Sequence, residues 1–498
     1  MSDTDIPTGW HLVRVTLEAL SPLSCAAGLG QEGDVALVRD ANGLPMIPGA
    51  TLQGLLKSCL ADRTLRDELF GYEKGKDTVR AKLVFSNALV HGSDNVAVGF
   101  PARMDDPLLE KLAEEAPVKR DHVRLDDRHG AAKGGKFDRA AVPAGARFSF
   151  EVLLRGSEDE KHKLAAALSG LKHPLFRIGG SGRRGYGRVD VGKANWAFFP
   201  AGQAKEFSTL RAAPLSSHGN MTALDLQAEG QVLTIEIALK PVQPWRSGQG
   251  PAAHGWHTMR PNKHFTDPNK PKPDPRKKAV DLVPVREARI DWEDANQCWQ
   301  DPSRDNLLGY VLPASGVRGP LLHRTVYHWN LLRGNFADAG TDGPAMLRQA
   351  REALDGLFGF VRDGKPVGDE AVARASPLFI DDVPLKVSSV EAVDHVRIDR
   401  FTGGVVQGAL YSQELVETAR LDLAIRIDAG RAGELNGDIR KAFLSALRDL
   451  AEGRLALGAK SLGFCTSIEG PHFSGEGKDA WEKAWPDTAR APKTVETV

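Results

Sequence analysis

Residues 34–54, DVALVRDANGLPMIPGATLQG, decide the fold, because the second half of the chain repeats their pattern. An acidic residue opens an apolar strand, an arginine closes it, and a proline-bearing turn then starts a helix. The second copy reads DLVPVRE at residues 281–287 and LPASGVRG at residues 312–319, with a longer loop between its two parts. An internal repeat of this length indicates a tandem of two related domains.

The repeat extends through both halves in the same order. Each half begins with an alternating apolar pattern typical of a strand, HLVRVTLEAL from His11 and QVLTIEIALK from Gln231. The later paired segments are LFG at Leu69 and Leu357, KLVFSNAL from Lys82 and SPLFIDDV from Ser376, HVRLDDRHG from His122 and HVRIDRFTG from His395, RFSFEVLL from Arg147 and RLDLAIRI from Arg420, HKLAAALSGL from His162 and RKAFLSALRDL from Arg440, and RIGGSGRRGYGRV from Arg177 and ALGAKSLGFCTSI from Ala456. Strands and two main helices alternate irregularly in each half, which predicts an α+β fold of two ferredoxin-like, RRM-like domains.

Composition changes along the chain predict the domain boundaries. We expect a first domain at 8–200, a linker rich in Ala, Ser and Gly at 201–228, a second domain at 229–475 and a C-terminal tail at 476–498. The second domain carries an insertion at about 246–280, whose Pro, Lys and Arg content is typical of a mobile basic loop. A further insertion from Asp291 is also expected to be a loop.

The composition argues against several classes of protein. No apolar run in the 498 residues approaches the length of a membrane helix, and the N-terminal MSDTDIPTGW lacks the basic start and apolar core of a signal peptide, so we expect a cytoplasmic protein without membrane contact. The four cysteines are far apart and form no C-x-x-C pair, which argues against a disulfide framework and a zinc ribbon. The formal net charge is zero, so nucleic-acid binding would depend on local basic surfaces.

The combined motifs D-x-x-x-x-R-D, P-G-x-x-L-x-G, LFG, R-[IL]-D-R-x-T-G and R-R-G-Y-G resemble the repeat-associated mysterious protein (RAMP) superfamily of CRISPR effectors. Within it, the chain is most similar to backbone subunits of type III complexes, and the fused tandem resembles the double backbone subunits of type III-D-like systems. The resemblance implies that each domain holds guide RNA on an RRM-like palm and projects a thumb hairpin into the guide–target duplex. It also implies that an aspartate after the first strand cleaves target RNA, which is Asp34 in the first domain and Asp281 in the second. The implied partners are guide crRNA, complementary target RNA and other type III subunits, namely a large signalling subunit, a small subunit and further backbone subunits.

One carboxylate can be enough for this reaction, because the nucleophile is the 2′-hydroxyl of the RNA itself. Asp34 would act as a general base, or would recruit Mg²⁺ as a cofactor, where splayed bases align the 2′-hydroxyl with its phosphate. The alternative for Asp34 is a turn cap. Asp281 lies between two insertions, and if it has no catalytic role the second domain only holds guide RNA. The loop SPLSCAAGLG from Ser21 contains no histidine, so the sequence does not identify a general acid.

Three kinds of segment are candidates for RNA contact. The proline-bearing helix starts offer backbone N–H groups and a positive dipole end to a phosphate. The glycine-rich loops and the arginines near the thumbs suit a sugar-phosphate backbone or stacked bases. The candidate residues are Gly49, Gln53, Lys57, Arg124, Gly179, Gly180, Arg183, Arg184, Arg318, Arg324, Arg397, Arg400 and Lys460. The alternatives are helix starts without a ligand, tight glycine turns and Asp–Arg pairs within a domain.

These patterns favour a type III CRISPR backbone subunit that binds crRNA and cleaves complementary RNA endonucleolytically. A non-catalytic crRNA-binding scaffold, with cleavage left to sister subunits, is one alternative. A nuclease that processes guide precursors is another. Such an enzyme usually needs a histidine or lysine acid–base cluster, which the sequence does not show.

Overall fold

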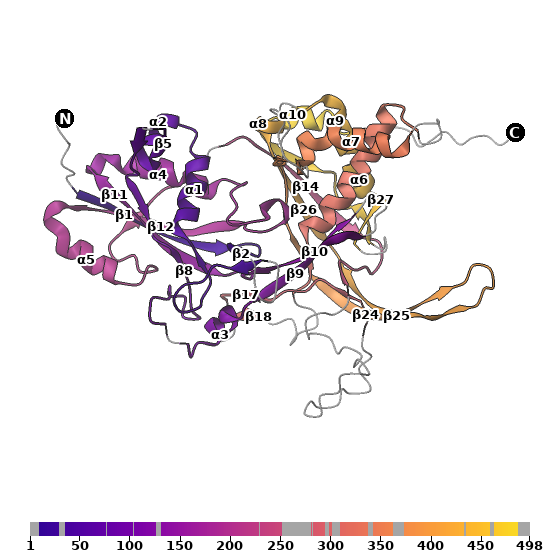
Figure 1. The fold of residues 1–498 in the computed structure, drawn as a ribbon, viewed down its shortest axis with the longest axis horizontal. Coiled ribbons are helices and arrows are strands. Elements are labelled where there is room, and N and C mark those ends of the chain that lie inside the picture. Colours follow the sequence, from indigo (N-terminus) through magenta and orange to yellow (C-terminus); the bar gives the residue numbers. More distant parts are fainter. Residues whose placement is uncertain are drawn as a thin grey trace. The chain divides into compact units, whose positions relative to one another are not determined.

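The structure is a computed structural model that describes residues 9–28, 35–75, 77–102, 104–125, 131–228, 230–250, 280, 282–293, 298–300, 309–336, 342–361, 373–432, 435–458 and 463–486. The chain forms two compact units (Figure 1). Unit 1 contains residues 1–230 and 286–309, and unit 2 contains residues 231–285 and 310–498. Helices and antiparallel sheets are mixed in both units, which confirms the predicted α+β class. Among the described residues, no helix is both long and apolar enough to cross a membrane.

Unit 1 is built on an antiparallel sheet whose described strands follow the order β13-β12-β1-β11-β8-β4, with β7 also paired to β11. The strands are β1 (Gly9–Ala19), β4 (Met46–Ile47), β7 (Leu83–Phe85), β8 (Ala88–Val90), β11 (Arg147–Gly156), β12 (Val189–Pro200) and β13 (Thr222–Ala223). Alternate residues of β1 point to opposite faces, as the sequence pattern predicts. Val13, Val15 and Leu17 are fully buried on one face, and Leu12 and Arg14 on the other.

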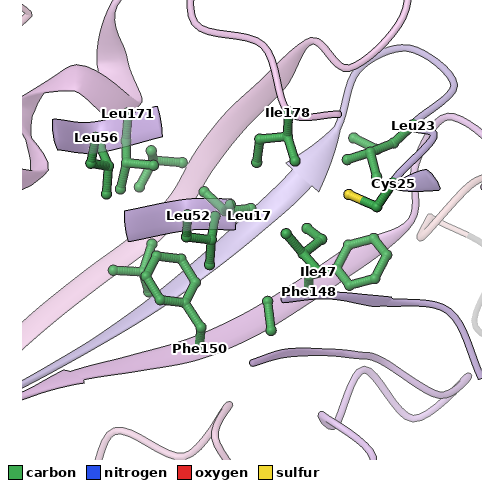
Figure 2. Close-up of a cluster of buried hydrophobic side chains, with 14 of the residues drawn as sticks. Leu17, Leu23, Cys25, Ile47, Leu52, Leu56, Phe148, Phe150, Leu171 and Ile178 are labelled. Carbon is green, nitrogen blue, oxygen red and sulfur yellow. The ribbon is translucent and has the colours of Figure 1, made fainter. Parts of the chain in front are cut away.

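Helices cover the first face of this sheet. They are α1 (Gly49–Cys59), α2 (Arg63–Phe70), α3 (Pro107–Ala113) and α4 (Lys161–Ser169). Figure 2 shows Leu52 and Leu56 of α1 together with Phe148 and Phe150 of β11 in the core. The apolar spacing of α1 therefore places one helix face against the sheet.

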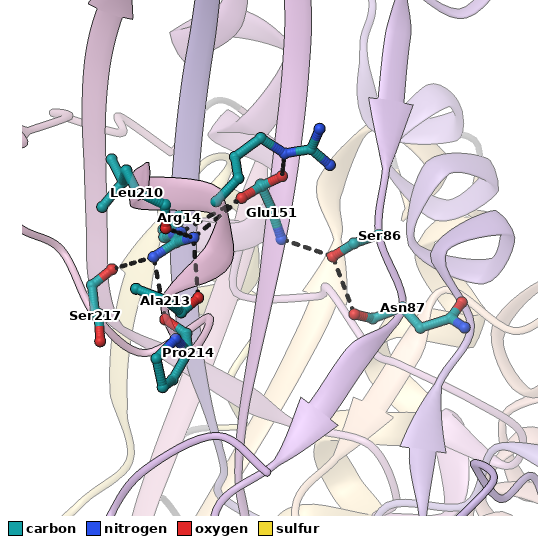
Figure 3. A network of polar contacts seen from close by, with 9 residues as sticks. Arg14, Ser86, Asn87, Glu151, Leu210, Ala213, Pro214 and Ser217 are labelled. Atoms are coloured by element: carbon teal, nitrogen blue, oxygen red, sulfur yellow. Dashed lines mark hydrogen bonds and ion pairs between the residues drawn. The ribbon is translucent and has the colours of Figure 1, made fainter. Parts of the chain in front are cut away.

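The opposite face is covered by residues 201–228, which the sequence analysis expects to be a linker. They contain helix α5 (Ala204–Ala212) and strand β13 of the sheet. Arg14, with 0% of its surface exposed, donates hydrogen bonds to the carbonyl oxygens of Leu210 (2.7 Å) and Ser217 (2.6 Å) and pairs with Glu151 at 3.3 Å (Figure 3). The linker expectation is wrong, because a buried guanidinium on β1 needs the carbonyl groups of this segment as acceptors.

Residues 286–309 were expected to belong to the second domain and to contain a loop from Asp291, and the structure differs on both points. They contain β17 (Arg289–Ile290) and β18 (Trp299–Gln300), and they belong to unit 1. The Ile290 N–H donates to the Ala144 carbonyl at 2.8 Å, and the Trp292 indole N–H donates to the Gly145 carbonyl at 2.7 Å. Because Ile290 is buried in the core of unit 1, burial of its side chain accounts for this return of the chain.

Unit 2 repeats the design. The described strands of its sheet follow the order β22-β26-β14-β28-β27, with β29 also paired to β14. The elements are β14 (Val232–Pro241), α6 (Ala314–Leu332), α7 (Gly343–Phe358), β22 (Leu378–Ile380), β26 (Leu421–Asp428), α8 (Ala429–Ala432), α9 (Gly437–Ala451), β27 (Glu452–Leu457), β28 (Gly463–Ser467), β29 (His472–Gly475) and α10 (Lys478–Glu482). Val13 lies opposite Val152 in unit 1 as Ile235 lies opposite Ile425 in unit 2. The expected tail at 476–498 is folded in part, since Trp481 of α10 is buried in the core of unit 2.

The repeated LFG motif ends the second helix of each unit in the same way. Asp62 and Asp342 cap the starts of α2 and α7 by accepting hydrogen bonds from backbone N–H groups. Gly71 and Gly359 end these helices with φ values of +68° and +70°, a conformation that favours glycine. The glycine of each motif is therefore required by the backbone.

Each unit also contains a long two-stranded hairpin. The hairpins are β9 (Val118–Leu125) with β10 (Ala131–Ala141) in unit 1 and β24 (Val387–Ile398) with β25 (Val405–Thr418) in unit 2. Figure 1 shows β24 and β25 as a ribbon that extends away from the helices of unit 2. The remaining short strands are β2 (Ala26–Gly28), β3 (Ala36–Leu37), β5 (Tyr72–Lys74), β6 (Asp77–Val79), β15 (Gly248–Gly250), β16 (Val283–Pro284), β19 (Val311–Leu312), β20 (Phe360–Val361), β21 (Ala373–Arg374) and β23 (Val383–Pro384).

Candidate nucleic-acid interface

Both predicted catalytic aspartates, Asp34 and Asp281, lie outside the described residues, and so does Lys460. The residues that follow the aspartates are described, and they occupy equivalent places. The Val35 carbonyl accepts a hydrogen bond from the Ala140 N–H of β10 at 3.2 Å. The Leu282 carbonyl accepts one from the Glu414 N–H of β25 at 2.9 Å. The sequence alignment of Asp34 with Asp281 therefore agrees with the register of the two hairpins, while their catalytic role stays a prediction.

The first strands of the two hairpins carry equivalent histidines. His122 lies directly opposite Phe137 across the hairpin of unit 1, and their rings stack with centroids 5.0 Å apart. His395 lies opposite Tyr411 across the hairpin of unit 2, with ring centroids 5.1 Å apart. The H-V-R motif thus marks a histidine–aromatic stack in both units.

The tip of the unit 2 hairpin exposes both charged and apolar side chains. Arg397 and Arg400 are exposed, and Phe401 between the strands has 91% of its surface exposed. The Asp399 carboxylate accepts hydrogen bonds from the N–H groups of Phe401 and Thr402, which lower the pKa of this exposed carboxyl. Asp399 therefore shapes the turn itself. In unit 1, Arg124 belongs to β9, and its side chain lies outside the described part.

The glycine-rich loop of unit 1 packs tightly at one end and exposes arginine at the other. Gly179 has a φ of +84°, and a side chain there would meet the carbonyl group of Ser24. Gly180 donates its N–H to the same Ser24 carbonyl at 3.0 Å. Gly179 and Gly180 thus hold the loop against the chain, whereas Arg183 and Arg184 form a short 3₁₀ turn beyond them.

Arg184 and the unit 1 hairpin together form a basic aromatic surface, which we define as His122, Phe137 and Arg184; the fully buried Tyr186 packs against His122. The exposed Arg184 guanidinium lies 5.4 Å from the centre of the Phe137 ring. The Tyr186 hydroxyl and the His122 Nε2 are hydrogen-bonded at 2.9 Å. A planar guanidinium on an aromatic ring is well suited to phosphate contact and base stacking. Phe137 and Tyr186 were not among the predicted residues. The R-R-G-Y-G motif contains the signal for Tyr186, whereas the place of Phe137 opposite His122 depends on strand register.

His122 is neutral at physiological pH. Its burial, together with the positive charges of Arg184, Arg120 and Arg139, lowers the pKa of His122 to about 4. A neutral imidazole stacks on Phe137 without desolvating a charge. His122 therefore contributes to the surface as a ring and a hydrogen-bonding group, not as a protonated acid.

The predicted phosphate sites at the helix starts are occupied by the chain itself. The Gly49 N–H at the start of α1 donates to the Asn87 side-chain oxygen at 2.9 Å. The Ala314 N–H at the start of α6 donates to the Asp382 carboxylate at 2.8 Å. A side chain at Gly49 would lie 2.6 Å from the Phe85 carbonyl oxygen, so this glycine serves packing. The expectation for Gly49 is corrected, because a side-chain oxygen already takes the place predicted for phosphate oxygen.

Three predicted RNA-binding cations also have partners inside their own units. Lys57 donates to the Gly71 carbonyl, and Arg318 donates to the Phe358 carbonyl at 2.5 Å. These two cations hold the ends of equivalent helices, α2 and α7. Arg324 forms an ion pair with the buried Asp449 carboxylate. The structure thus gives these cations anchoring roles, and Gln53 is a half-buried residue of α1.

The family model of the RAMP superfamily matches residues 16–190, most of unit 1. A similar relative is the CRISPR system Cms endoribonuclease Csm3 of Methanocaldococcus jannaschii, which is 28% identical over 171 residues. This alignment covers 31% of the present chain and 66% of the relative, so the chain spans just under two thirds of the relative's length.

Proposed function

We propose that this chain, whose unit 1 belongs to the RAMP superfamily, is a tandem backbone subunit of a type III CRISPR ribonucleoprotein. In this proposal the chain binds guide crRNA and cleaves complementary RNA. The main observation in support of this proposal is that, in both units, the residue after the predicted catalytic aspartate is hydrogen-bonded to the second strand of a long hairpin. A loop bearing a carboxylate is thereby attached to the base of an element suited to separate two RNA strands. The type III-D-like assignment and the identity of the neighbouring subunits are parts of the same proposal.

Guide binding is supported by the basic aromatic surface of unit 1. Arg184 offers a guanidinium fork to phosphate oxygens, while Phe137 and His122 already form a stack on which a base can continue. In unit 2 the corresponding positions are His395 and Tyr411, and Arg397 and Arg400 lie farther out on the hairpin. The two units therefore offer RNA related but unequal contacts.

Cleavage would begin at the RNA 2′-hydroxyl. The Asp34 or Asp281 carboxylate takes the proton of this hydroxyl, and the 2′-oxygen attacks the adjacent phosphorus as the bond to the 5′-oxygen breaks. The leaving 5′-oxygen takes a proton from solvent water, so the products are a 2′,3′-cyclic phosphate and a 5′-hydroxyl. Hairpin insertion contributes by fixing the attacking oxygen in line with the leaving oxygen.

The proposed Mg²⁺ cofactor has no support from the described residues. No group of three or more His, Cys, Asp or Glu side chains is placed there to hold a metal ion. The carboxylates next to His122 and Phe137 are those of Asp121 and Asp138, and they pair with Lys136 at 3.5 Å and with Lys119 at 2.9 Å. The involvement of Mg²⁺ stays a prediction.

Photocrosslinking tests the proposed RNA surface. The full chain is bound to guide-length RNA containing 4-thiouridine, irradiated and digested, and the crosslinked peptides are identified by mass spectrometry. We expect crosslinks in residues 118–141, 177–189 and 387–418. Crosslinks confined to α5 and α10, which lie outside these segments, would contradict the proposed interface.

A further inference from the structure

Arg139 and Arg246 occupy matching sites in the two units although they come from different positions of the repeat. In unit 1, Leu23 pairs with Val142, and in unit 2, Trp245 pairs with Val416. Leu23 and Trp245 are therefore equivalent, and the residues that follow them, Ser24 and Arg246, correspond to each other. This register also makes Arg139 equivalent to Gln413, because each lies three residues before its valine.

Hydrogen bonds support this equivalence. Ala140, which follows Arg139, donates to the Val35 carbonyl, as Glu414, which follows Gln413, donates to the Leu282 carbonyl. The contacts of the two glycine-rich loops support the same equivalence of Ser24 and Arg246. A side chain at Gly179 would meet the Ser24 carbonyl group, and one at Gly458 would meet the Arg246 carbonyl group.

Unit 1 thus combines arginine on the hairpin strand with serine beside the glycine loop, and unit 2 combines glutamine on the strand with arginine beside the loop. The unit 1 pair is in direct contact, since the Arg139 Nη1 lies 3.4 Å from the Ser24 Oγ. In unit 2 the Arg246 Nη1 donates to the Val283 carbonyl at 3.3 Å, two residues after Asp281. The Arg246 guanidinium thus contacts the segment that follows a predicted catalytic aspartate, while in unit 1 the backbone of Ala140, the residue after Arg139, bonds to that segment at Val35.

Both guanidinium groups are incompletely satisfied. The Nε atoms of Arg139 and Arg246 are buried and have no hydrogen-bond partner among the described residues. Arg246 has only 3% of its surface exposed, and Arg139 is half-buried. Neither forms an ion pair with a carboxylate in the described part of the chain, and burial lowers the pKa of both groups. A buried guanidinium without an anion is unfavourable, so these sites favour an anionic ligand.

We propose that Arg139 in unit 1 and Arg246 in unit 2 each bind one phosphodiester group of the RNA, beside the aspartate-bearing segment. This inference rests on the proposed function, and it adds two ligands that the sequence repeat does not reveal. The ligand is an RNA phosphodiester because Arg139 lies close to Arg184, the exposed cation that covers the Phe137 ring in the basic aromatic surface. Each unit keeps one guanidinium group at this site. It belongs to the hairpin strand in unit 1 and to the segment beside the glycine loop in unit 2.

The test relocates the charge within unit 1. Binding of the full chain to fluorescein-labelled single-stranded RNA is measured by fluorescence anisotropy at several KCl concentrations. Arg139→Gln should raise Kd about tenfold and reduce the slope of log Kd against log[salt] by about 0.7, the effect of one lost phosphate contact. Adding Ser24→Arg to Arg139→Gln should restore both values, because it gives unit 1 the arrangement of unit 2. The matched control is Arg63→Gln, which removes a charge that is 75% exposed on α2 and should change neither value.

Unit 2 is tested in the same way with Arg246→Ser, alone and combined with Gln413→Arg. Thermal unfolding of each variant checks that it is folded. If the double variant of unit 1 does not fold, Arg139→Lys replaces it; this change keeps the charge and should keep the salt slope.

The possible outcomes separate this inference from the proposed function. Absence of RNA binding by the unmodified chain would contradict the proposed function itself. If the unmodified chain binds RNA, and Arg139→Gln and Arg246→Ser change Kd and the salt slope no more than Arg63→Gln does, only the inference is overturned. A folded Ser24→Arg, Arg139→Gln double variant that binds no better than Arg139→Gln alone would overturn the equivalence of the two positions.

Discussion

Replacing Gly71 by alanine should destabilise unit 1 strongly. Gly71 has a φ of +68° at the end of α2, and an added Cβ atom would lie 2.6 Å from the Ala81 backbone nitrogen. A non-glycine residue in such a conformation costs roughly 1–3 kcal/mol. The collision is with backbone and cannot be relieved by a rotamer change, so we expect a total loss of about 2–4 kcal/mol in the free energy of unfolding.

The matched control is Gly54→Ala. Gly54 lies on the exposed face of α1, and no atom lies within 4 Å of the position its Cβ would take. Alanine there should stabilise the helix by about 0.5–1 kcal/mol, because it reduces the conformational freedom of the unfolded chain. Urea unfolding followed by circular dichroism measures both variants. Equal midpoints for Gly71→Ala and Gly54→Ala would refute the role assigned to the LFG glycine.

Three further predictions concern buried groups of unit 1 and the thiols. Arg14→Met removes one of two guanidinium partners of the buried Glu151, which keeps Arg211 at 2.8 Å, and leaves several carbonyl groups without their donor. It should lower the free energy of unfolding by about 2–4 kcal/mol and speed hydrogen exchange of α5; unchanged exchange would contradict this. Since the pKa of His122 falls from 6.5 in the unfolded chain to about 4, unit 1 should lose stability as the pH drops between these values, and His122→Gln should weaken that dependence in pH-resolved urea melts. Maleimide should label the exposed Cys59 in the native protein, but should label Cys25 and Cys465, whose pKa burial raises to about 12, only after unfolding.

The repeat could be predicted from the sequence because its markers are local. The LFG glycines need a particular backbone conformation, and the H-V-R histidines occupy fixed places in a strand, so each copy keeps a recognisable pattern. The tandem organisation and the α+β class follow from these markers. The superfamily match over residues 16–190 agrees with them.

The partners of long side chains could not be predicted in this way. Lys57 and Arg318 follow proline-bearing helix starts, which in sequence suits a phosphate site, but they reach backbone carbonyls of the following helix. The fully buried Arg14 likewise donates hydrogen bonds to carbonyl oxygens in residues 201–228, so this Ala- and Ser-rich segment packs on unit 1 and is not a linker. In each of these cases the acceptor is far away in the sequence and is brought close only by packing.

The correspondence between Arg139 and Arg246 at the candidate interface also could not be predicted from the sequence. The strand register pairs Arg139 with Gln413 and Ser24 with Arg246, so each position taken alone shows a positive charge in one unit only. Only the strand register and the glycine contacts place the two guanidinium groups at matching sites. Sequence comparison therefore underestimates how similar the two units are around these two arginines.

The most direct test of the proposed function is cleavage of a labelled complementary RNA by the complex assembled on guide crRNA, resolved on a sequencing gel. The unmodified chain is compared with Asp34→Ala, Asp281→Ala and the double variant, and with Asp190→Asn as a control at a carboxylate that is 58% exposed. We predict that each single change removes one distinct product while RNA binding persists, and that the control removes none. Survival of all products in the double variant would contradict cleavage by this chain and would leave it the role of a guide-binding scaffold.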